Sequence, residues 1–285
     1  MYNPNFIQIM NSPITVFLTL ITVIFSYQGL QNKTFFDKYA FNIEGVLRYK
    51  EYYRLISSGF LHGSWWHLLF NLYALFSFGE TLEMVIGGTN FLFIYFVSLI
   101  GGNVLSLYIH RFDSQYSAIG ASGAVCGVIF ASIVIFPDME IGMFLMPFSL
   151  TSWMYGLLFV LISIYGIKSR MSNIGHDAHL GGALLGMLVA IGLYPESLQA
   201  NYLPIVLVVT PTLAFIFLII KRPDYLFIES FTFNQKDYKN IDHEYNERKV
   251  ARQQEIDEIL EKIHSKGFDS LSEREKEALE RFSEK

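Results

Sequence analysis

The sequence predicts an all-α, polytopic membrane helical bundle followed by a small soluble helical C-terminal tail. Of the 285 residues, 52% are hydrophobic and only 16% are charged, whereas a soluble domain usually carries about 25% charged residues. The charges are also unevenly placed, because residues 221–285 hold 13 of the 21 Lys and Arg and 16 of the 26 Asp and Glu. We therefore expect a membrane domain at 1–220 and a charged helical tail at 221–285.

Seven apolar windows reach or approach the length of about 20 residues that a helix needs to cross a bilayer core. They lie at 12–30, 63–84, 90–110, 117–136, 149–167, 178–194 and 202–220. The first window lacks the positively charged flank of a cleaved signal peptide, so we expect it to remain as a span. The aromatic and charged residues between the first two windows, at 31–62, are typical of a connection at the membrane interface.

The tail is expected to form a solvated helical hairpin without chemistry of its own. Ser272 and Glu275 have the spacing of a capping box at a helix start. Before them, apolar residues recur at helical spacing, namely Ile256, Ile259, Leu260 and Ile263.

Composition argues against several other function classes. The net charge of −5 comes with a tail of mixed sign, so the basic patch of a nucleic-acid-binding protein is missing. Cys126 is the single cysteine, which excludes an internal disulfide and a cysteine-cluster metal site. His62, His67, His176 and His179 are candidate metal ligands, but no His-Glu-x-x-His motif occurs, and we expect no metal and no cofactor.

Polar side chains inside the predicted spans are the main functional candidates, because burying such groups in a membrane is costly. In the second span, His67 and Asn71 are four residues apart and so share one helix face. Both can donate hydrogen bonds into a common polar space. The alternative is an interhelical hydrogen-bond pair that serves packing alone.

The fourth span opens with Gly120-Ala-Ser-Gly123, which places Ser122 at or near a helix N-terminus. Free backbone N–H groups favour negative charge there. Gly123 and Gly127 form a small-xxx-small pattern that allows close helix contact. Taken alone, Ser122 is better explained as one more small interface residue.

The sixth span carries His179, followed on the same side of the helix by Gly182 and Gly186. A serine next to a close-packed histidine is an activated nucleophile with its base. Asp177 is a poor third member, because residues two apart on a helix point in different directions. The sequence therefore predicts a catalytic dyad of Ser122 and His179.

The order of these motifs on spans two, four and six resembles that of the rhomboid family of intramembrane serine proteases. The resemblance covers about residues 50–195. It is carried by His67-x-x-x-Asn71, Gly120-x-Ser122-Gly123, Ala178-His179 before Gly182-x-x-x-Gly186, Tyr53-Arg54 and Gly79-x-x-x-Glu83-x-x-x-Gly87. We expect Arg54 and Glu83 to have structural roles.

The resemblance implies a six-helix rhomboid-like core, with a seventh transmembrane helix added here. It also implies hydrolysis of peptide bonds in membrane-protein substrates within the lipid bilayer. Ser122 would be the nucleophile, His179 the general base and acid, and His67, Asn71 and the Ser122 backbone N–H the oxyanion stabilisers. Family members often have an aromatic ring four residues after the serine, stacked on the histidine, but here that residue is Cys126, so another group must orient His179.

Two other classes of protein are alternatives to a protease. A non-catalytic rhomboid-like protein that binds or escorts membrane proteins would typically lack the serine or the histidine, and this chain has both. A transporter or channel would carry paired intramembrane charges or broken helices in a repeated arrangement, which we do not find.

We expect a multi-pass protein of a bacterial cell membrane. The positive-inside rule places its basic loops in the cytoplasm, whereas the resemblance places the same side outside.

Overall fold

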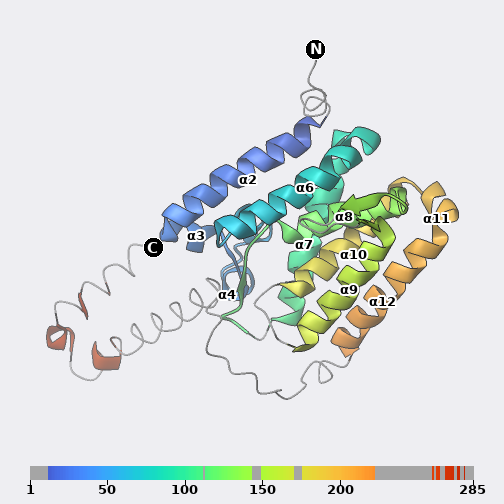
Figure 1. Cartoon of the computed structure of the whole chain (residues 1–285). Coiled ribbons are helices and arrows are strands. Elements are labelled where there is room, and N and C mark those ends of the chain that lie inside the picture. The colour runs from blue at the N-terminus through green and yellow to red at the C-terminus, as the bar shows by residue number, and fades with distance from the viewer. Residues whose placement is uncertain are drawn as a thin grey trace, which may run out of the picture. The chain divides into compact units, whose positions relative to one another are not determined.

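The computed structural model describes residues 12–111, 113–142, 149–169 and 175–221, and in the tail 259, 261–263, 267–272, 275–276 and 279. Its long helices overlap the seven predicted windows one by one (Figure 1). They are α2 (Pro13–Gln31), α6 (Trp65–Ile86), α7 (Gly88–Ile109), α8 (Ser122–Ile135), α9 (Ser152–Ser169), α10 (His176–Leu193) and α12 (Tyr202–Lys221).

The protein is an integral, multi-pass membrane protein with an all-α helical bundle. By length and composition, α2, α6, α7 and α10 can each cross a membrane, and α8, α9 and α12 are shorter apolar helices. Residues Gly123–Val134 of α8 are all buried, so α8 lies at the centre of the bundle. This burial explains why α8 carries no charged side chain, because no position between its ends meets water.

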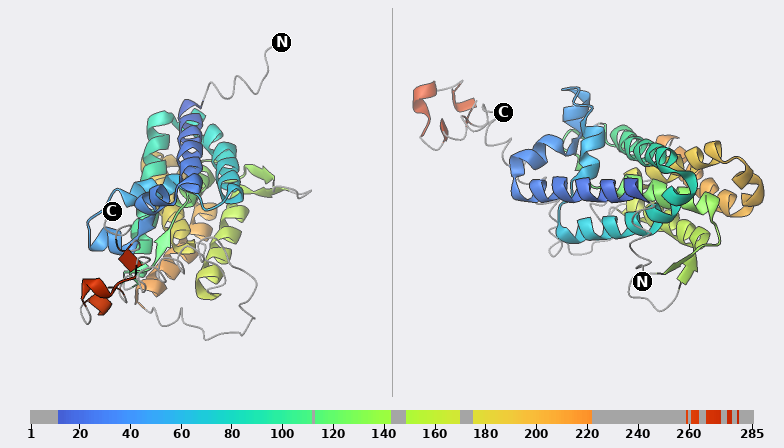
Figure 2. Two further views of the ribbon diagram at one scale, coloured as in Figure 1. Left: turned by 90° about the vertical axis from the view of Figure 1, so that its left-hand side faces the viewer. Right: turned by 90° about the horizontal axis from the view of Figure 1, so that it is seen from above.

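The helices are arranged around α8 and α10. Helix α10 packs against both α7 and α8, while α2 packs against α6 and α12 packs against α9. Figures 1 and 2 show α2 and α6 side by side on one flank of the bundle, and α9 and α12 side by side on another. The candidate residues on α6, α8 and α10 are thus carried by helices that meet in the interior.

The connection at 31–62 contains short elements that the sequence did not predict. These are α3 (Lys33–Tyr39), β1 (Phe41–Asn42), α4 (Ile43–Leu47), α5 (Arg54–Ser57) and the 3-10 turn η1 (Ser58–Phe60). The side chain of Asn32 caps α3 and that of Asn42 caps α4. Strand β1 pairs antiparallel with β2 (Ser117–Ala118), which places the connection beside the segment that leads into α8.

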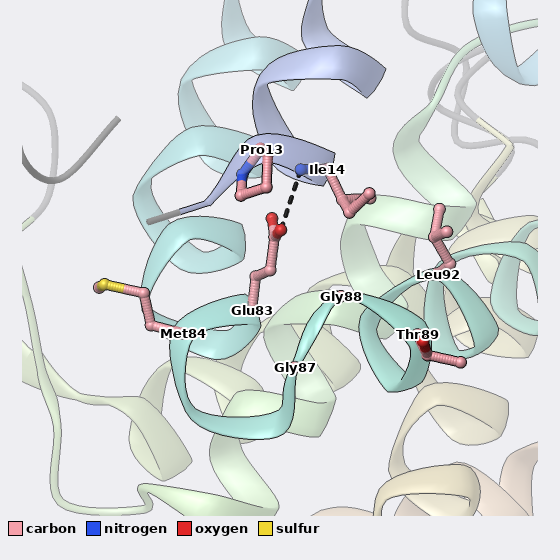
Figure 3. Close-up of a pocket in the computed structure, with 8 residues that line it drawn as sticks. All are labelled: Pro13, Ile14, Glu83, Met84, Gly87, Gly88, Thr89 and Leu92. Atoms are coloured by element: carbon pink, nitrogen blue, oxygen red, sulfur yellow. Dashed lines mark hydrogen bonds between the residues drawn. The ribbon is translucent and has the colours of Figure 1, made fainter. Parts of the chain in front are cut away.

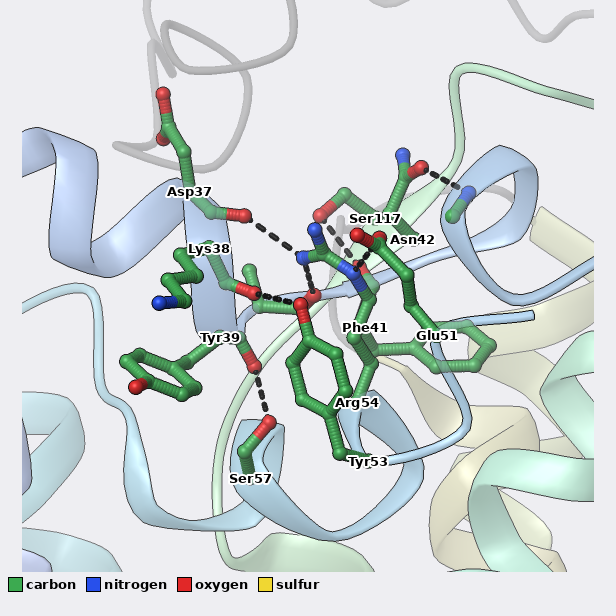
Figure 4. Close-up of polar contacts among 12 residues, drawn as sticks. Asp37, Lys38, Tyr39, Phe41, Asn42, Glu51, Tyr53, Arg54, Ser57 and Ser117 are labelled. Carbon is green, nitrogen blue, oxygen red and sulfur yellow. Dashed lines mark hydrogen bonds and ion pairs between the residues drawn. The ribbon is translucent and has the colours of Figure 1, made fainter. Parts of the chain in front are cut away.

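Arg54 holds this connection together (Figure 4). Its Nε donates to Glu51 Oε2 at 2.6 Å, and one of its terminal nitrogens donates to the carbonyl oxygens of Asp37 and Ala40, at 2.7 Å each. Tyr53 adds a hydrogen bond from its hydroxyl to the Lys38 carbonyl at 3.2 Å. One planar guanidinium thus joins the C-terminal end of α3 to the start of α5, which a lysine could not reproduce with its single nitrogen.

Glu83 caps the first span from the second one. Its carboxylate accepts hydrogen bonds from the backbone N–H of Ile14 at 2.9 Å, and from the N–H and hydroxyl of Thr15 at 2.7 and 2.8 Å. A negative charge at a helix N-terminus is favourable, and here it joins α2 to α6. A pocket opens at this corner (Figure 3), lined by Pro13, Ile14, Glu83, Met84, Gly87, Gly88, Thr89 and Leu92.

Two further elements complete the membrane unit. An antiparallel pair of strands, β3 (Glu140–Gly142) and β4 (Ser149–Thr151), precedes α9. A short helix, α11 (Glu196–Ala200), lies between α10 and α12.

The chain divides into two compact units, Met1–Phe233 and Asn234–Lys285, and the boundary expected at 220/221 remains a prediction. Within the tail, Ile259 and Leu271 are buried against Ile263 and Leu279. The Ser272 N–H and hydroxyl donate to Glu275 at 2.6 and 2.7 Å, which confirms the capping box. A hydrogen bond from the Lys262 ammonium and, after it, these two bonds from Ser272 lower the pKa of Glu275 to about 2. The expected helix residues Ile256 and Leu260 lie outside the described residues.

Candidate active site

Ser122 is presented by a tight turn at the start of α8. The sequence predicted a span from 117, but residues 117–118 form β2 and the helix begins at Ser122 itself. Between them, Gly120 has φ +120° and donates its N–H to the Ser58 carbonyl at 2.9 Å. A side chain at Gly120 would be strained by this backbone and would meet the His67 ring at 3.0 Å. The glycine therefore lets the chain turn closely around His67.

His179 lies in the first turn of α10 and meets Ser122 directly. Its Nε2 is 2.6 Å from Ser122 Oγ, which is a short hydrogen bond between a hydroxyl and an imidazole. Both side chains are partly exposed. If the serine donates, Nε2 is the unprotonated ring nitrogen and can accept the hydroxyl proton. This is the geometry of a nucleophile with its base.

Glycines allow α8 and α10 to approach this closely. A Cβ added to Gly182 would lie 2.0 Å from the Gly123 carbonyl oxygen, and one added to Gly186 would lie 2.3 Å from the Gly127 carbonyl oxygen. Any side chain at Gly182 or Gly186 would push the two backbones apart. The small-residue patterns of spans four and six thus face each other.

His67, on α6, faces the start of α8, and Asn71 follows it on the same helix. The His67 ring adjoins Gly120, two residues before Ser122. The Asn71 side chain is buried and donates to the His67 carbonyl at 3.0 Å, within its own helix. The structure therefore places His67 beside the Ser122 turn. Asn71 lies one helical turn further along α6, with its amide bonded to the backbone.

The sequence suggested His62 only as a candidate metal ligand, but the structure places it beside the turn before Ser122. It is fully buried between η1 and α6, and its Nε2 accepts the N–H of Ala121, the residue before Ser122, at 3.4 Å. Its Nδ1 is 2.9 Å from Ser26 Oγ on α2. Burial, and secondarily the charge of His67, lower the pKa of His62 to about 3. A neutral imidazole thus supports the turn that presents Ser122.

Phe159 of α9 lies where an aromatic partner for His179 was expected to be missing. The two ring centroids are 6.0 Å apart at an angle of 36°. Phe159 also packs against Phe130 and Tyr155, with centroids at 5.6 and 6.5 Å. Cys126 itself is buried in α8, so the ring beside His179 comes from another helix. No local sequence pattern reveals this contact, because Phe159 and His179 lie on different helices, α9 and α10.

The other histidines do not gather into a metal site in the part of the chain that the structure describes, where no group of three His, Cys, Asp or Glu could hold an ion. His176 meets His179 edge-on, with centroids 5.9 Å apart. The hydrogen bonds of Arg54 are within the 31–62 connection, and those of Glu83 are to the start of α2, so both residues support the scaffold.

Comparison with known proteins assigns the class. A family model described as "Rhomboid domain" matches residues 49–196, just over half of the chain. The chain therefore belongs to the Rhomboid family. A second model, described as a family of unknown function (DUF6576), matches residues 239–285.

Individual relatives agree with this family. The chain is 35% identical to Rhomboid protein 1, mitochondrial, of Saccharomyces cerevisiae, over 47% of this chain and 40% of that protein. It is 33% identical to the putative rhomboid protease YdcA of Bacillus subtilis, over 49% and 66%. It is 30% identical to the rhomboid protease AarA of Providencia stuartii, over 55% and 62%. The match thus spans less than two thirds of each of these relatives.

Proposed function

We propose that this protein is an intramembrane serine endopeptidase that cleaves transmembrane or membrane-proximal segments of other membrane proteins. The observation that carries the proposal is the 2.6 Å hydrogen bond between Ser122 Oγ and His179 Nε2 at the N-terminus of α8. Names of relatives such as the rhomboid protease AarA support it. The substrates are membrane proteins in the lipid bilayer, without nucleic acid, metal or cofactor.

The first chemical step forms an acyl-enzyme. Ser122 Oγ attacks the carbonyl carbon of the scissile peptide bond, and His179 Nε2 takes the hydroxyl proton. The Ser122 backbone N–H is free to meet the resulting oxyanion because it belongs to the first turn of α8. His67 and Asn71 are the further donors, and Asn71 must turn away from the His67 carbonyl to reach the oxyanion.

Collapse of the tetrahedral intermediate breaks the C–N bond, and His179 gives its proton to the leaving amine. A water molecule then attacks the acyl-enzyme, with His179 now accepting a proton from the water. The second tetrahedral intermediate releases the new carboxyl terminus, and the proton returns to Ser122 Oγ. The partial exposure of Ser122 and His179 fits this need for water inside an otherwise apolar bundle.

The decisive experiment measures cleavage of a membrane-embedded reporter in proteoliposomes. Ser122→Ala and His179→Ala should each abolish cleavage while the protein stays folded, and the double variant should be no worse than either. A fluorophosphonate probe should label the wild type and not Ser122→Ala. Near wild-type turnover in either single variant would disprove the dyad.

The alternative is a rhomboid-like protein that binds or escorts membrane proteins without cleaving them. It would leave the reporter intact and the probe unreacted, although the protein still bound the substrate. The hydrogen-bonded dyad favours the enzyme. Placement in a bacterial cell membrane stays our prediction, since relatives include both bacterial and mitochondrial proteins. We also propose that 1–220 acts as the protease domain and 221–285 as a separate soluble tail.

A further inference from the structure

Asp177 forms a buried polar cluster with α7, two residues before His179. The Asp177 residue is 5% exposed. Its Oδ2 accepts a hydrogen bond from the Ser106 hydroxyl and lies 3.3 Å from His110 Nε2. An ionised carboxylate oxygen can only accept a hydrogen bond, so His110 donates to it from a protonated Nε2. This cluster fixes the first turn of α10 to the end of α7.

The cluster acts on the side of α10 opposite to the dyad. Residues two apart on a helix are rotated by about 200°, so Asp177 faces α7 while His179 faces Ser122 on α8. The α7 side is also closely packed, because a Cβ added to Gly102 would lie 2.5 Å from the Ala178 carbonyl oxygen. The first turn of α10 is thus held from one side and presents its histidine on the other.

His110 extends the cluster to the segment before Ser122. Its ring stacks flat on Tyr116, with centroids 3.6 Å apart and planes at 6°. Tyr116 directly precedes β2, and its carbonyl accepts the N–H of Ile43 at 3.2 Å. Strand β2 leads through Gly120 to Ser122. The His110 side chain therefore contacts both Asp177, two residues before His179, and Tyr116, on the segment that leads to Ser122.

We propose that Asp177 is a positioning residue for His179, and that His110 couples it to the chain leading to Ser122. The proposal rests on the proposed function, because it assumes that His179 is the base. Asp177 does not take part in proton transfer, since its carboxylate bonds to α7. Its contribution is to hold His179 at the distance and angle at which Nε2 receives the Ser122 proton.

The substitutions test separately the hydrogen-bond acceptor of Asp177, its negative charge and the stacking of the His110 ring on Tyr116. Asp177→Leu removes the acceptor at similar volume, whereas Asp177→Asn keeps an oxygen that can accept both hydrogen bonds. His110→Phe keeps a ring to stack on Tyr116 and removes the donor. Tyr194→Phe is the matched control, because the Tyr194 hydroxyl bonds to Asn90 at 3.1 Å and joins α10 to α7 at their other ends.

The assay uses the full chain in proteoliposomes and reports kcat, KM, the rate of fluorophosphonate labelling and the melting temperature. Asp177→Leu should lower kcat and labelling about 10- to 100-fold with KM nearly unchanged, as expected when reacting groups are displaced by about 1 Å. Asp177→Asn should retain most of the wild-type kcat. Adding His110→Phe to Asp177→Leu should cost little more, because the two residues act as one unit.

Tyr194→Phe should lower the melting temperature without lowering kcat. If Asp177→Leu kept the kcat of Tyr194→Phe at equal folded fraction, Asp177 would be only structural and the proposal would fail. If Asp177→Leu did not fold, a loss of kcat in His110→Phe would support the proposal and a wild-type kcat would overturn it. Cleavage by Ser122→Ala would instead overturn the proposed function itself.

Discussion

Replacing Gly182 by alanine should inactivate the protein without touching a reacting group. The new Cβ would lie 2.0 Å from the Gly123 carbonyl oxygen and 2.7 Å from its carbonyl carbon. Ordinary contact begins at 3.4 Å, so α8 and α10 would have to separate by about 1.4 Å. Both groups are backbone, so no side-chain rotation can relieve the clash.

That separation acts directly on the dyad. Gly123 adjoins Ser122, and Gly182 follows His179 by less than one helical turn. A hydrogen bond that starts at 2.6 Å and lengthens by about 1 Å is no longer a hydrogen bond. A displacement of this size can cost about 10²-fold in rate, and we expect at least this loss in kcat.

Gly192→Ala on the same helix provides the matched control, because nothing lies within 4 Å of a Cβ at this position. It should keep wild-type kcat and stabilise α10 by up to about 1 kcal/mol, since alanine favours a helix over glycine. Both variants are purified in detergent, checked by thermal melts and assayed on one reporter substrate. Equal kcat in the two alanine variants would show that backbone contact between α8 and α10 does not position the dyad.

Three further predictions concern the rest of the molecule. Asn71→Ala should lower kcat about tenfold and change KM less. This loss is smaller than the factor of about 10²–10³ typical of a lost oxyanion donor, because other donors remain. Unchanged kcat in steady-state assays would remove Asn71 from the site. Folded His62 resists protonation down to a pKa of about 3, whereas an unfolded histidine binds its proton near pH 6.5. The free energy of unfolding should therefore fall as pH drops from about 6.5 toward 3, and His62→Gln should flatten this slope in thermal melts. Deleting 222–285 should leave cleavage of a minimal reporter intact, and a folded but inactive truncation would make the tail part of the machinery.

The spans and the facing glycines were accessible from the sequence because they depend on local composition and helical spacing. Seven windows correspond to seven helices, and the patterns at Gly123 and Gly182 lie against each other. The short elements of 31–62 were not predicted: α3 and α4 are too short for a helical repeat and are capped locally by Asn32 and Asn42, whereas β1 depends on a distant partner. Strand β1 exists through its pairing with β2, which lies two spans away.

The surroundings of the dyad were less accessible for the same reason. Sequence spacing indicates that Asp177 faces away from His179, but the identity of its partners depends on how α7 ends. It also leaves unassigned the ring beside His179, which Phe159 supplies from α9. Periodicity reveals which face a side chain occupies, and only tertiary packing determines what that face meets.

A hydrogen bond that can pass a proton must be held steadily within an apolar bundle, and the first turn of α10 shows how this is achieved. Backbone-to-backbone contact through Gly102 on one side and Gly182 on the other leaves the turn little freedom to shift. These contacts set the distance between the helices. The Asp177 carboxylate, which bonds to Ser106 and His110 at the end of α7, adds a polar contact that resists rotation of the turn. Substitutions at Gly182 and Asp177 should therefore impair the same step through different contacts of the first turn, one with α8 and the other with α7.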